Sequence, residues 1–338
     1  MNEEVLRQET KRHFWIDHAR GFIMILLVVT EFIPQVIRDG PLQFLLAHPD
    51  NQTITTVMNF FDIGAPAFIF IMGILMPISF FRRKEKKGTK SAVNHMIIRY
   101  GIILVLGLIV VFIDQGSFLK EVDEMTIINW DVLPTLGLIG FITLPFLWLN
   151  PKIRAIIASG MLIFYQIMIM FAGWRDYAIA SVHGGILGTI FSFSAFMILS
   201  TCIGEYLLIG DNNEKKKYQN YSMIGVICLI VGLLLAFLPE WYANKRQVTL
   251  SYIMISFGAT ILLSLIFVYI DKKVQKPIII LDSYGKNPFL IYVIAIVLEF
   301  LISDIIGYEI DLIIGPIMIV VISLIAILLD RKQKIVTL

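Results

Sequence analysis

Long apolar segments separated by short polar stretches run along the whole chain. A helix needs about 20 apolar residues to cross the hydrocarbon core of a bilayer, and each of these segments approaches that length. The pattern therefore predicts about ten membrane-spanning helices. The predicted spans cover residues 16–37, 53–80, 96–113, 132–149, 155–172, 186–209, 222–238, 250–270, 288–306 and 312–329.

The composition supports an all-α fold, a polytopic membrane helix bundle. Hydrophobic residues make up 57% of the 338 residues, the mean hydropathy is +0.80 and charged residues make up 16%, against about 25% in an ordinary soluble domain. The spans and their connections fill the chain, so we expect a single transmembrane domain over residues 1–338. Motifs of soluble nucleotide-binding enzymes and zinc proteases are absent from the sequence. Cys202 and Cys228 lie inside apolar segments, so no metal site is expected.

Lysine and arginine residues are distributed unevenly between the two sides that alternating spans define. Of the 28 such residues, 20 lie on the side of the N-terminus and five lie on the opposite side. Because cytoplasmic loops carry the excess of positive charge, this distribution predicts that both termini are cytoplasmic. The five residues on the predicted outer side are Arg38, Lys120, Arg175, Lys245 and Arg246.

Three cations fall within or at the ends of predicted spans on the cytoplasmic side. They are Arg20, Arg99 and Lys286, with Asp17 and His18 close to the first of them. One interpretation is that the arginine side chains reach out to lipid headgroups, as cations at span ends commonly do. The other is that three cations at one depth bind a phosphorylated ligand arriving from the cytoplasm.

Two carboxylates are predicted in the outer half of the first two spans, near a loop histidine. Glu31 and Asp62 lie inside apolar segments, where a charge is costly and usually marks a function. His48 precedes Asp62 by 14 residues. A neutral imidazole can take a proton from an attacking hydroxyl or amine near pH 7, and a carboxylate can orient it. The simpler interpretations are a solvated histidine and acids that hydrogen-bond to neighbouring helices.

Five stretches of the chain carry motifs that occur in the same order in one family of membrane enzymes. They are IDHARGFIMILLVV, DIGAPAFIFIMG, HGGILGTIFS, NKRQVTLSYIMISFGA and YGKNPFLIYV. The chain resembles the heparan-alpha-glucosaminide N-acetyltransferase-like transmembrane acyltransferases, including their bacterial members. The residues that carry the resemblance include Asp17, Arg20, Gly21, Asp62, Pro66, Phe68, Gly185 to Ile190, Asn244, Lys245, Ser251, Tyr252, Gly285, Asn287 and Tyr292.

The resemblance implies an enzyme of the bacterial cell membrane that binds acetyl-coenzyme A from the cytoplasm and passes the acetyl group to an amino sugar on the far side. The family uses a loop histidine between its first two spans, which corresponds to His48. We expect Asp62 or Glu31 to assist it, and Asn244 or Asn287 to stabilise the developing oxyanion. A donor site is expected at Arg20, Arg99 and Lys286, together with Asp17 and Asn287.

The chain departs from the family pattern at four places. The spacing from His48 to Asp62 is a few residues longer than in the animal enzyme, and Glu31 stands where that enzyme has asparagine. VLPTLGL in the fourth span lacks an arginine of the family pattern, and the large luminal insertions are missing. These departures leave the acyl-transfer core in place and leave the acceptor open.

Two rival functions remain open at the level of the sequence. A proton-coupled transporter or flippase would use Glu31 and Asp62 as a proton relay for a small polar or lipid-linked substrate. A relative in the broader acyltransferase superfamily would instead O-acetylate a polysaccharide. As partners we expect a small-molecule acyl donor, a sugar or glycan acceptor and membrane lipid, with no nucleic acid; a homodimer is one expected assembly.

Overall fold

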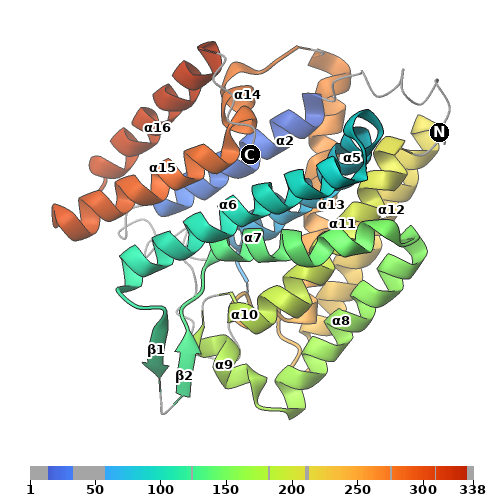
Figure 1. The fold of residues 1–338 in the computed structure, drawn as a ribbon, viewed down its shortest axis with the longest axis horizontal. Helices are drawn as coiled ribbons and strands as arrows, with labels where there is room; N and C mark the ends of the chain where they lie inside the picture. The colour runs from blue at the N-terminus through green and yellow to red at the C-terminus, as the bar shows by residue number, and fades with distance from the viewer. Residues whose placement is uncertain are drawn as a thin grey trace. The chain divides into compact units, whose positions relative to one another are not determined.

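The computed structural model describes residues 14–32, 58–122, 125–181, 183–209, 213–274, 276–308 and 310–332, and these residues are mostly helical (Figure 1). The α-helices are α2 (Phe14–Glu31), α5 (Gly64–Lys87), α6 (Thr89–Gln115), α7 (Val132–Thr143), α8 (Pro151–Phe171), α9 (Trp174–Ala180), α10 (Gly185–Gly188), α11 (Ser194–Gly204), α12 (Glu214–Ala236), α13 (Leu250–Val274), α14 (Ile279–Lys286), α15 (Pro288–Phe300) and α16 (Ile314–Arg331). Short 3-10 helices are η1 (Phe60–Ile63) and η2 (Leu144–Trp148), and π-helical segments are η3 (Thr189–Phe193), η4 (Glu205–Ile209) and η5 (Leu301–Ile305).

Seven helices in the described part of the chain are long and apolar enough to cross a membrane. The count rises to eight if α14 and α15, which are bent by 86° at their junction, form one broken span. A shorter apolar helix runs over Val132–Trp148. These observations confirm the prediction of a polytopic helical membrane protein.

Several helices extend beyond the apolar segments that predicted them. α5 continues through the basic residues to Lys87, and α6 begins at Thr89, so Arg99 lies ten residues into its helix and not near its start. The apolar pattern marks where a helix can enter lipid. The helix itself continues as long as its backbone hydrogen bonds are satisfied, which polar side chains in water do not prevent.

The chain divides into two compact units, and unit 1 joins the two ends of the chain. Its described residues are 14–32, 59–68, 262–274, 276–308 and 310–332, which include α2, η1, α14, α15, η5 and α16. α14 packs against α2 and against α16, and α15 also packs against α2. The packing of α2 on α14 can be followed in Figure 1.

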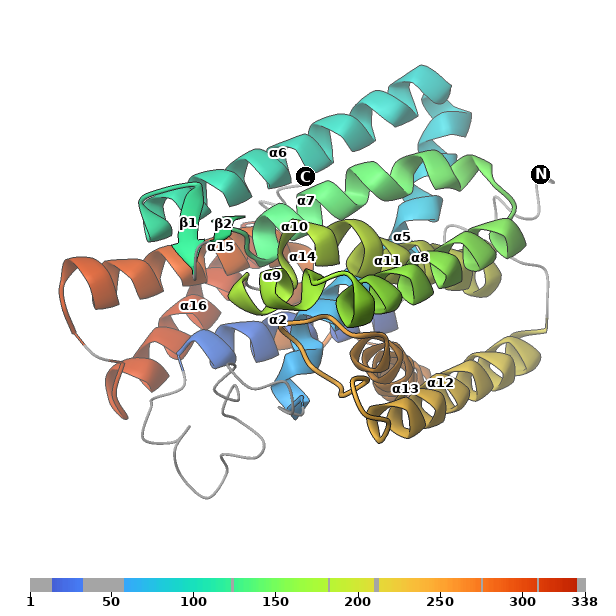
Figure 2. The same cartoon turned by 90° about the horizontal axis from the view of Figure 1, so that it is seen from below.

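Unit 2 contains residues 69–261, apart from the short gaps in the described chain. α6 packs on α7, and α8 packs on α11, which Figure 2 shows as neighbouring helices. Three phenylalanine rings, Phe70, Phe196 and Phe257, meet edge to face at centroid distances of 5.2 to 6.4 Å. Such pairs add packing energy to the hydrophobic gain of burying the rings.

Two predicted connections of unit 2 contain regular structure. β1 (Leu119–Val122) pairs antiparallel with β2 (Met125–Ile128), with Leu119 opposite Ile128. The connection after α8 contains the short helix α9. The apolar pattern predicts both as plain loops, because neither segment is long or apolar enough to be a span.

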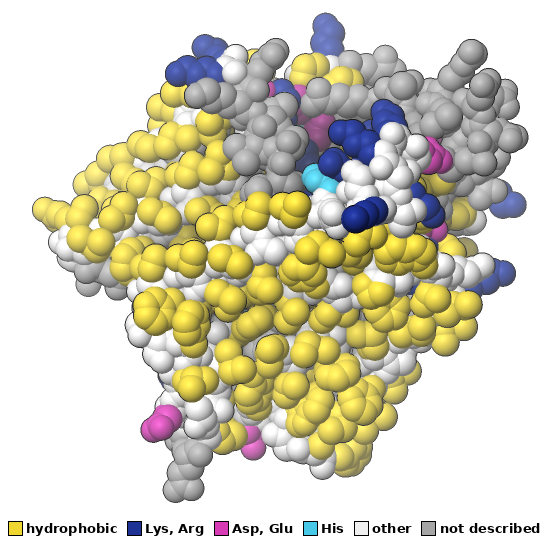
Figure 3. Space-filling view, in the orientation of Figure 1, with side chains coloured by type: hydrophobic (Ala, Val, Ile, Leu, Met, Phe, Trp, Pro, Cys, Tyr) yellow, Lys and Arg dark blue, Asp and Glu magenta, His cyan; other side chains and the backbone are white. Residues whose placement is uncertain are grey.

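Large apolar side chains cover much of the face shown in Figure 3. Helices of both units carry such side chains in exposed positions, for example Ile98 on α6, Ile156 on α8 and Ile317 on α16, which are 60%, 72% and 49% exposed. Apolar surface of this extent is expected of helices that face lipid.

Candidate functional site

Two glycines allow α2 and α14 of unit 1 to cross in close contact. A Cβ atom added at Gly21 would lie 1.9 Å from the Leu281 carbonyl oxygen, and one added at Gly285 would lie 2.3 Å from the Asp17 carbonyl oxygen. Real Cβ contacts essentially never fall below 3.0 Å. Only glycine therefore fits at either position, and the crossing brings the polar residues of the two helices together.

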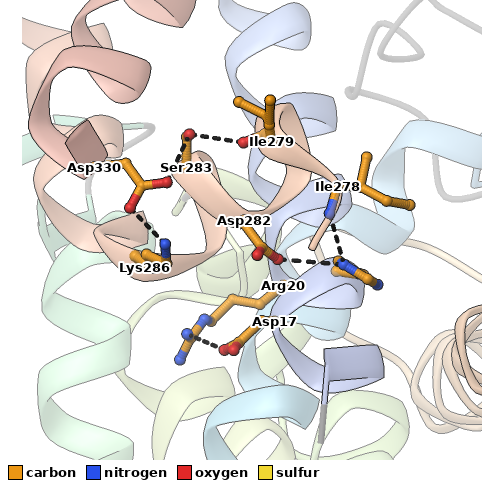
Figure 4. A network of polar contacts seen from close by, with 9 residues as sticks. Asp17, Arg20, Ile278, Ile279, Asp282, Ser283, Lys286 and Asp330 are labelled. Carbon is orange, nitrogen blue, oxygen red and sulfur yellow. Dashed lines mark hydrogen bonds and ion pairs between the residues drawn. The ribbon is translucent and has the colours of Figure 1, made fainter. Parts of the chain in front are cut away.

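A histidine and an aspartate lie fully buried at this crossing. His18 is 0% exposed and Asp282 is 1% exposed. The His18 Nε2 atom lies 3.2 Å from Asp282 Oδ1, and the Ile278 backbone N–H donates to the same nitrogen over 3.3 Å. Figure 4 shows these contacts at the start of α14.

Two further ion pairs lie beside the buried pair and reach the surface (Figure 4). The Arg20 guanidinium donates to Asp17 Oδ1 over 2.8 Å, and the Lys286 ammonium donates to Asp330 Oδ1 on α16 over 2.5 Å. The Ser283 hydroxyl donates to Asp330 Oδ2 over 3.2 Å. The charged side chains of the two ion pairs are 18% to 22% exposed.

The electrostatics of the network distinguish the buried pair from the two pairs at its edge. The Arg20–Asp17 and Lys286–Asp330 pairs keep about a fifth of each side chain exposed, so both cations can be reached from water. His18 and Asp282 are shielded from water, so separating them would leave uncompensated polar groups inside the protein.

The chain bends sharply directly after Lys286. α14 and α15 meet at 86°, with Asn287 at φ −127° and ψ 47° and only 1% exposed between them. The first backbone N–H groups of α15 have no partner within that helix, so its N-terminal end carries partial positive charge. The bend adds this partial charge to that of Lys286.

α14 corrects an expectation from the sequence. Hydropathy predicts the stretch DSYGKN as a polar connection leading into the ninth span, whereas it forms most of an eight-residue helix in which Ser283, Tyr284 and Gly285 are buried. Its polar residues are tolerated there because Asp330, Ser323 and His18 provide partners from α16 and α2.

Unit 1 also contains the two carboxylates predicted for the outer side. Asp62 is 1% exposed, and its Oδ2 atom accepts a hydrogen bond from the Asn59 backbone N–H over 2.7 Å at the start of η1. Glu31 is the last residue of α2 and is half-buried. The burial of Asp62 thus has at least one structural reason, the capping of η1.

The remaining predicted site residues lie elsewhere. Arg99 belongs to unit 2, with its guanidinium carbon 5.7 Å from the centre of the Tyr100 ring. Asn244, also in unit 2, is buried, and its side-chain oxygen accepts from the Gln247 backbone N–H over 2.9 Å. His48 lies outside the described residues. The structure therefore brings together Asp17, Arg20, Lys286 and Asn287 of the predicted set.

A buried arginine in unit 2 is absent from the site residues predicted by the sequence. Arg154 is 0% exposed, donates to Thr201 Oγ1 over 2.8 Å and forms an ion pair with Glu205. The sequence contains a signal for it: Asn150 caps α8 and Pro151 is its first residue, a combination typical of a helix start. Arg154 therefore belongs to the first turn of a helix and not to a connecting loop.

Carboxylates accompany the cations of unit 1, yet they do not form a metal site. Among the residues that the structure describes, no group of three or more His, Cys, Asp or Glu side chains could hold a metal ion.

The fold and the network define a class, a helical membrane protein with a polar site built where helices from the two ends of the chain cross. The chain belongs to the family described as acyltransferase domain, whose model matches residues 13–329. No curated protein matches the sequence. The protein is thus a membrane acyltransferase by family, and the transmembrane acyltransferase resemblance of the sequence is supported at this level.

Proposed function

We propose that the protein transfers an acetyl group from cytoplasmic acetyl-coenzyme A to an amine or hydroxyl of a sugar or glycan outside the cytoplasm. The observation that carries this proposal is the site at the crossing of α2 and α14, where Arg20 and Lys286 are partly exposed, in a chain whose family is acyltransferases. The finer likeness to the heparan-alpha-glucosaminide N-acetyltransferase-like enzymes enters as part of the proposal.

In the proposed donor site, phosphate groups of the coenzyme replace the carboxylates of Asp17 and Asp330 as the partners of Arg20 and Lys286. Phosphate carries more charge and more acceptor atoms than a carboxylate, so the exchange is favourable where the ion pair is partly exposed. The N-terminal end of α15 adds a third source of positive potential after Asn287. The role of Arg99, which lies in unit 2, stays a prediction from the sequence.

In the proposed reaction, His48 takes the proton from the acceptor amine or hydroxyl, with Asp62 or Glu31 as the assisting carboxylate. The acceptor atom attacks the thioester carbon, the new acyl bond forms, and the carbon–sulfur bond breaks. The coenzyme leaves as a thiol once its sulfur has taken up a proton. Asn244 is the proposed hydrogen-bond donor to the oxyanion.

In the proposed topology the protein lies in the cell membrane and crosses it ten times. Both termini are in the cytoplasm. Besides the helices that pass the length and hydropathy criteria, this topology counts the bent pair α14–α15, the shorter helix Val132–Trp148 and α2. α2 is 18 residues long and contains three charged residues, Asp17, Arg20 and Glu31. The uneven distribution of Lys and Arg supports this orientation.

The proposal treats residues 1–338 as one transmembrane acyltransferase domain, because the family model runs through both compact units. Neither the transporter nor the flippase alternative is favoured by the family match. The proposal includes both amine and hydroxyl acceptors, and the same activity assay distinguishes them.

Purified protein incubated with labelled acetyl-coenzyme A and a panel of sugars tests the reaction directly. We expect transfer to glucosamine or to a sugar that offers only hydroxyl groups, and a loss of about 100-fold or more in His48→Ala. His95→Ala, a half-buried histidine on α6, is the control and keeps its activity. Full activity in His48→Ala would show that the catalytic assignment is wrong.

Donor binding is tested separately by calorimetry with acetyl-coenzyme A. We expect Arg20→Gln and Lys286→Gln each to raise Kd about tenfold, which corresponds to about 1.4 kcal/mol. Lys216→Gln removes the same charge from an exposed position on α12 and leaves Kd unchanged. Equal effects of all three variants would point to a general loss of positive charge and not to a site.

A further inference from the structure

His18 contacts two different groups of α14 with a single ring nitrogen. Nε2 lies 3.3 Å from the Ile278 backbone nitrogen and 3.2 Å from Asp282 Oδ1. The Asp282 backbone N–H donates to the Ile278 carbonyl over 2.8 Å, so these two residues bound the first turn of α14. His18 therefore touches both ends of the turn with which that helix begins.

A ring nitrogen has either a lone pair or a proton, never both. With a lone pair, Nε2 accepts the hydrogen bond from Ile278; with a proton, it donates to the Asp282 carboxylate. Each contact joins the first turn of α14 to α2.

The His18 side chain also has an aromatic neighbour on its own helix. The Phe14 ring stacks on the His18 ring at 6.3 Å with an interplanar angle of 23°, and the contact of Gly21 with Leu281 closes the crossing next to it. Because His18 is fully buried, a ligand does not reach the imidazole itself. Any effect of His18 on a ligand is transmitted through the helix that it docks.

That helix ends at the cation of the proposed donor site. α14 is eight residues long and Lys286 is its last residue, one turn after Asp282. Residues four apart lie on the same face of a helix, so the docking of Asp282 on His18 fixes the face from which Lys286 extends. Arg20 lies two residues after His18 on α2.

We propose that His18 is a positioning residue for the acyl donor: it docks the first turn of α14 on α2 and thereby aligns Lys286 with Arg20. The identity of the ligand in this inference rests on the proposed function. The docking of α14 on α2 is independent of that function. The docking needs a polar group at the depth of Nε2, and an aromatic ring without nitrogen does not replace it.

Glutamine is the informative replacement, because its terminal amide carries an acceptor and a donor on separate atoms. In His18→Gln the oxygen can accept from Ile278 while the nitrogen donates to Asp282, so both contacts are made at once. His18→Phe keeps the ring and removes the polar atoms. His18→Asn is polar but too short to reach Ile278, and it covers the case in which the phenylalanine variant does not fold.

Two measurements on the purified full chain test the proposal. Hydrogen–deuterium exchange of peptides covering residues 276–286 reports on the docking, and steady-state kinetics with acetyl-coenzyme A reports on the alignment. We expect His18→Phe and His18→Asn to exchange faster in this segment and to raise the donor KM about tenfold, with kcat within about threefold. His18→Gln restores both values, and the control His95→Phe changes neither.

The proposal is overturned if His18→Phe, folded, exchanges residues 276–286 as slowly as the wild type. It is equally overturned if the glutamine variant is as impaired as the phenylalanine variant, since shape and not polarity would then matter. Failure of the proposed function has a different signature, a wild-type protein that binds no acetyl-coenzyme A. In that case the exchange data alone still decide whether His18 docks α14.

Discussion

At the scale of single residues, the proposed donor site depends on two positions without a side chain. Gly21 and Gly285 each face the backbone of the opposite helix, so the distance between α2 and α14 is set by main-chain contact. Backbone cannot move aside as the end of a flexible side chain can. The alignment of Arg20 and Lys286 is therefore sensitive to the addition of one methyl group.

Gly21→Ala is expected to destabilise the protein by about 1–3 kcal/mol, the usual cost of overpacking, and to weaken the binding of acetyl-coenzyme A. Thermal unfolding in detergent and calorimetry measure the two effects. Gly160→Ala on α8 is the matched control, because a Cβ there meets nothing within 4 Å. Alanine at that site stabilises the helix by up to about 1 kcal/mol, so equal losses in both variants would contradict the close crossing.

The sequence predicts some residues of the polar site at the crossing of α2 and α14 and misses others. Asp17 and Arg20 could be selected because charges within an apolar segment are costly and so carry information, and Lys286 because it is a cation at the border of the ninth span. Asp282 and Asp330 could not, since hydropathy places one in a polar connection and the other at the polar end of the last span. The apolar pattern contains no signal that these two carboxylates pair with His18 and Lys286.

At the scale of elements, hydropathy predicts the long helices and misses what stabilises their ends. α7, α8 and α12 begin at Asp131, Asn150 and Asn213, whose side chains accept hydrogen bonds from backbone N–H groups. Such caps satisfy groups that a helix leaves unpaired at its start. They explain why α8 and α12 begin in polar sequence, before the apolar segments that predict them.

A carboxylate also caps the start of α16, and its contribution to stability can be tested by changing the pH. Asp311 Oδ1 accepts from the backbone N–H groups of Ile314 and Ile313 over 2.7 and 2.8 Å. These hydrogen bonds, the one from Ile314 first, hold the pKa of the Asp311 carboxyl below its ordinary value of 3.8. The ionised carboxylate thus stabilises the folded state above that value, and the contribution is lost as pH falls through the folded-state pKa.

We therefore expect Asp311→Ala to lower the melting temperature at pH 7, and the difference from the wild type to shrink as the pH falls below about 3.8. Asp311→Asn keeps an acceptor oxygen and loses less. Glu121→Ala removes an exposed carboxylate from β1 and serves as the control. A difference that grows toward low pH would reverse the sign and refute the capping role.

At the scale of the whole molecule, the family match establishes that the protein is an acyltransferase. The proposed transfer of an acetyl group across the membrane depends in addition on the orientation of the spans. In the proposed topology β1 lies outside the cell and the start of α12 lies in the cytoplasm. Both segments offer an exposed lysine, Lys120 and Lys216. Their accessibility to a reagent that does not cross the membrane reports on orientation.

In a background with Cys202 and Cys228 replaced by serine, we expect Lys120→Cys to react with an impermeant maleimide in intact cells. Lys216→Cys should react only after the membrane has been opened. The reverse pattern would place the termini outside and would separate the proposed donor site from cytoplasmic acetyl-coenzyme A.

The crossing of α2 and α14 also bears on biogenesis. His18 and Ile278 are 260 positions apart, so α2 emerges from the ribosome long before the segment that covers its buried imidazole. During synthesis the early helix must keep this polar face in water, against a translocation channel or against a temporary neighbour. Truncated chains that stop before residue 278 should accordingly be recognised by membrane quality control, whereas full-length chains should escape it.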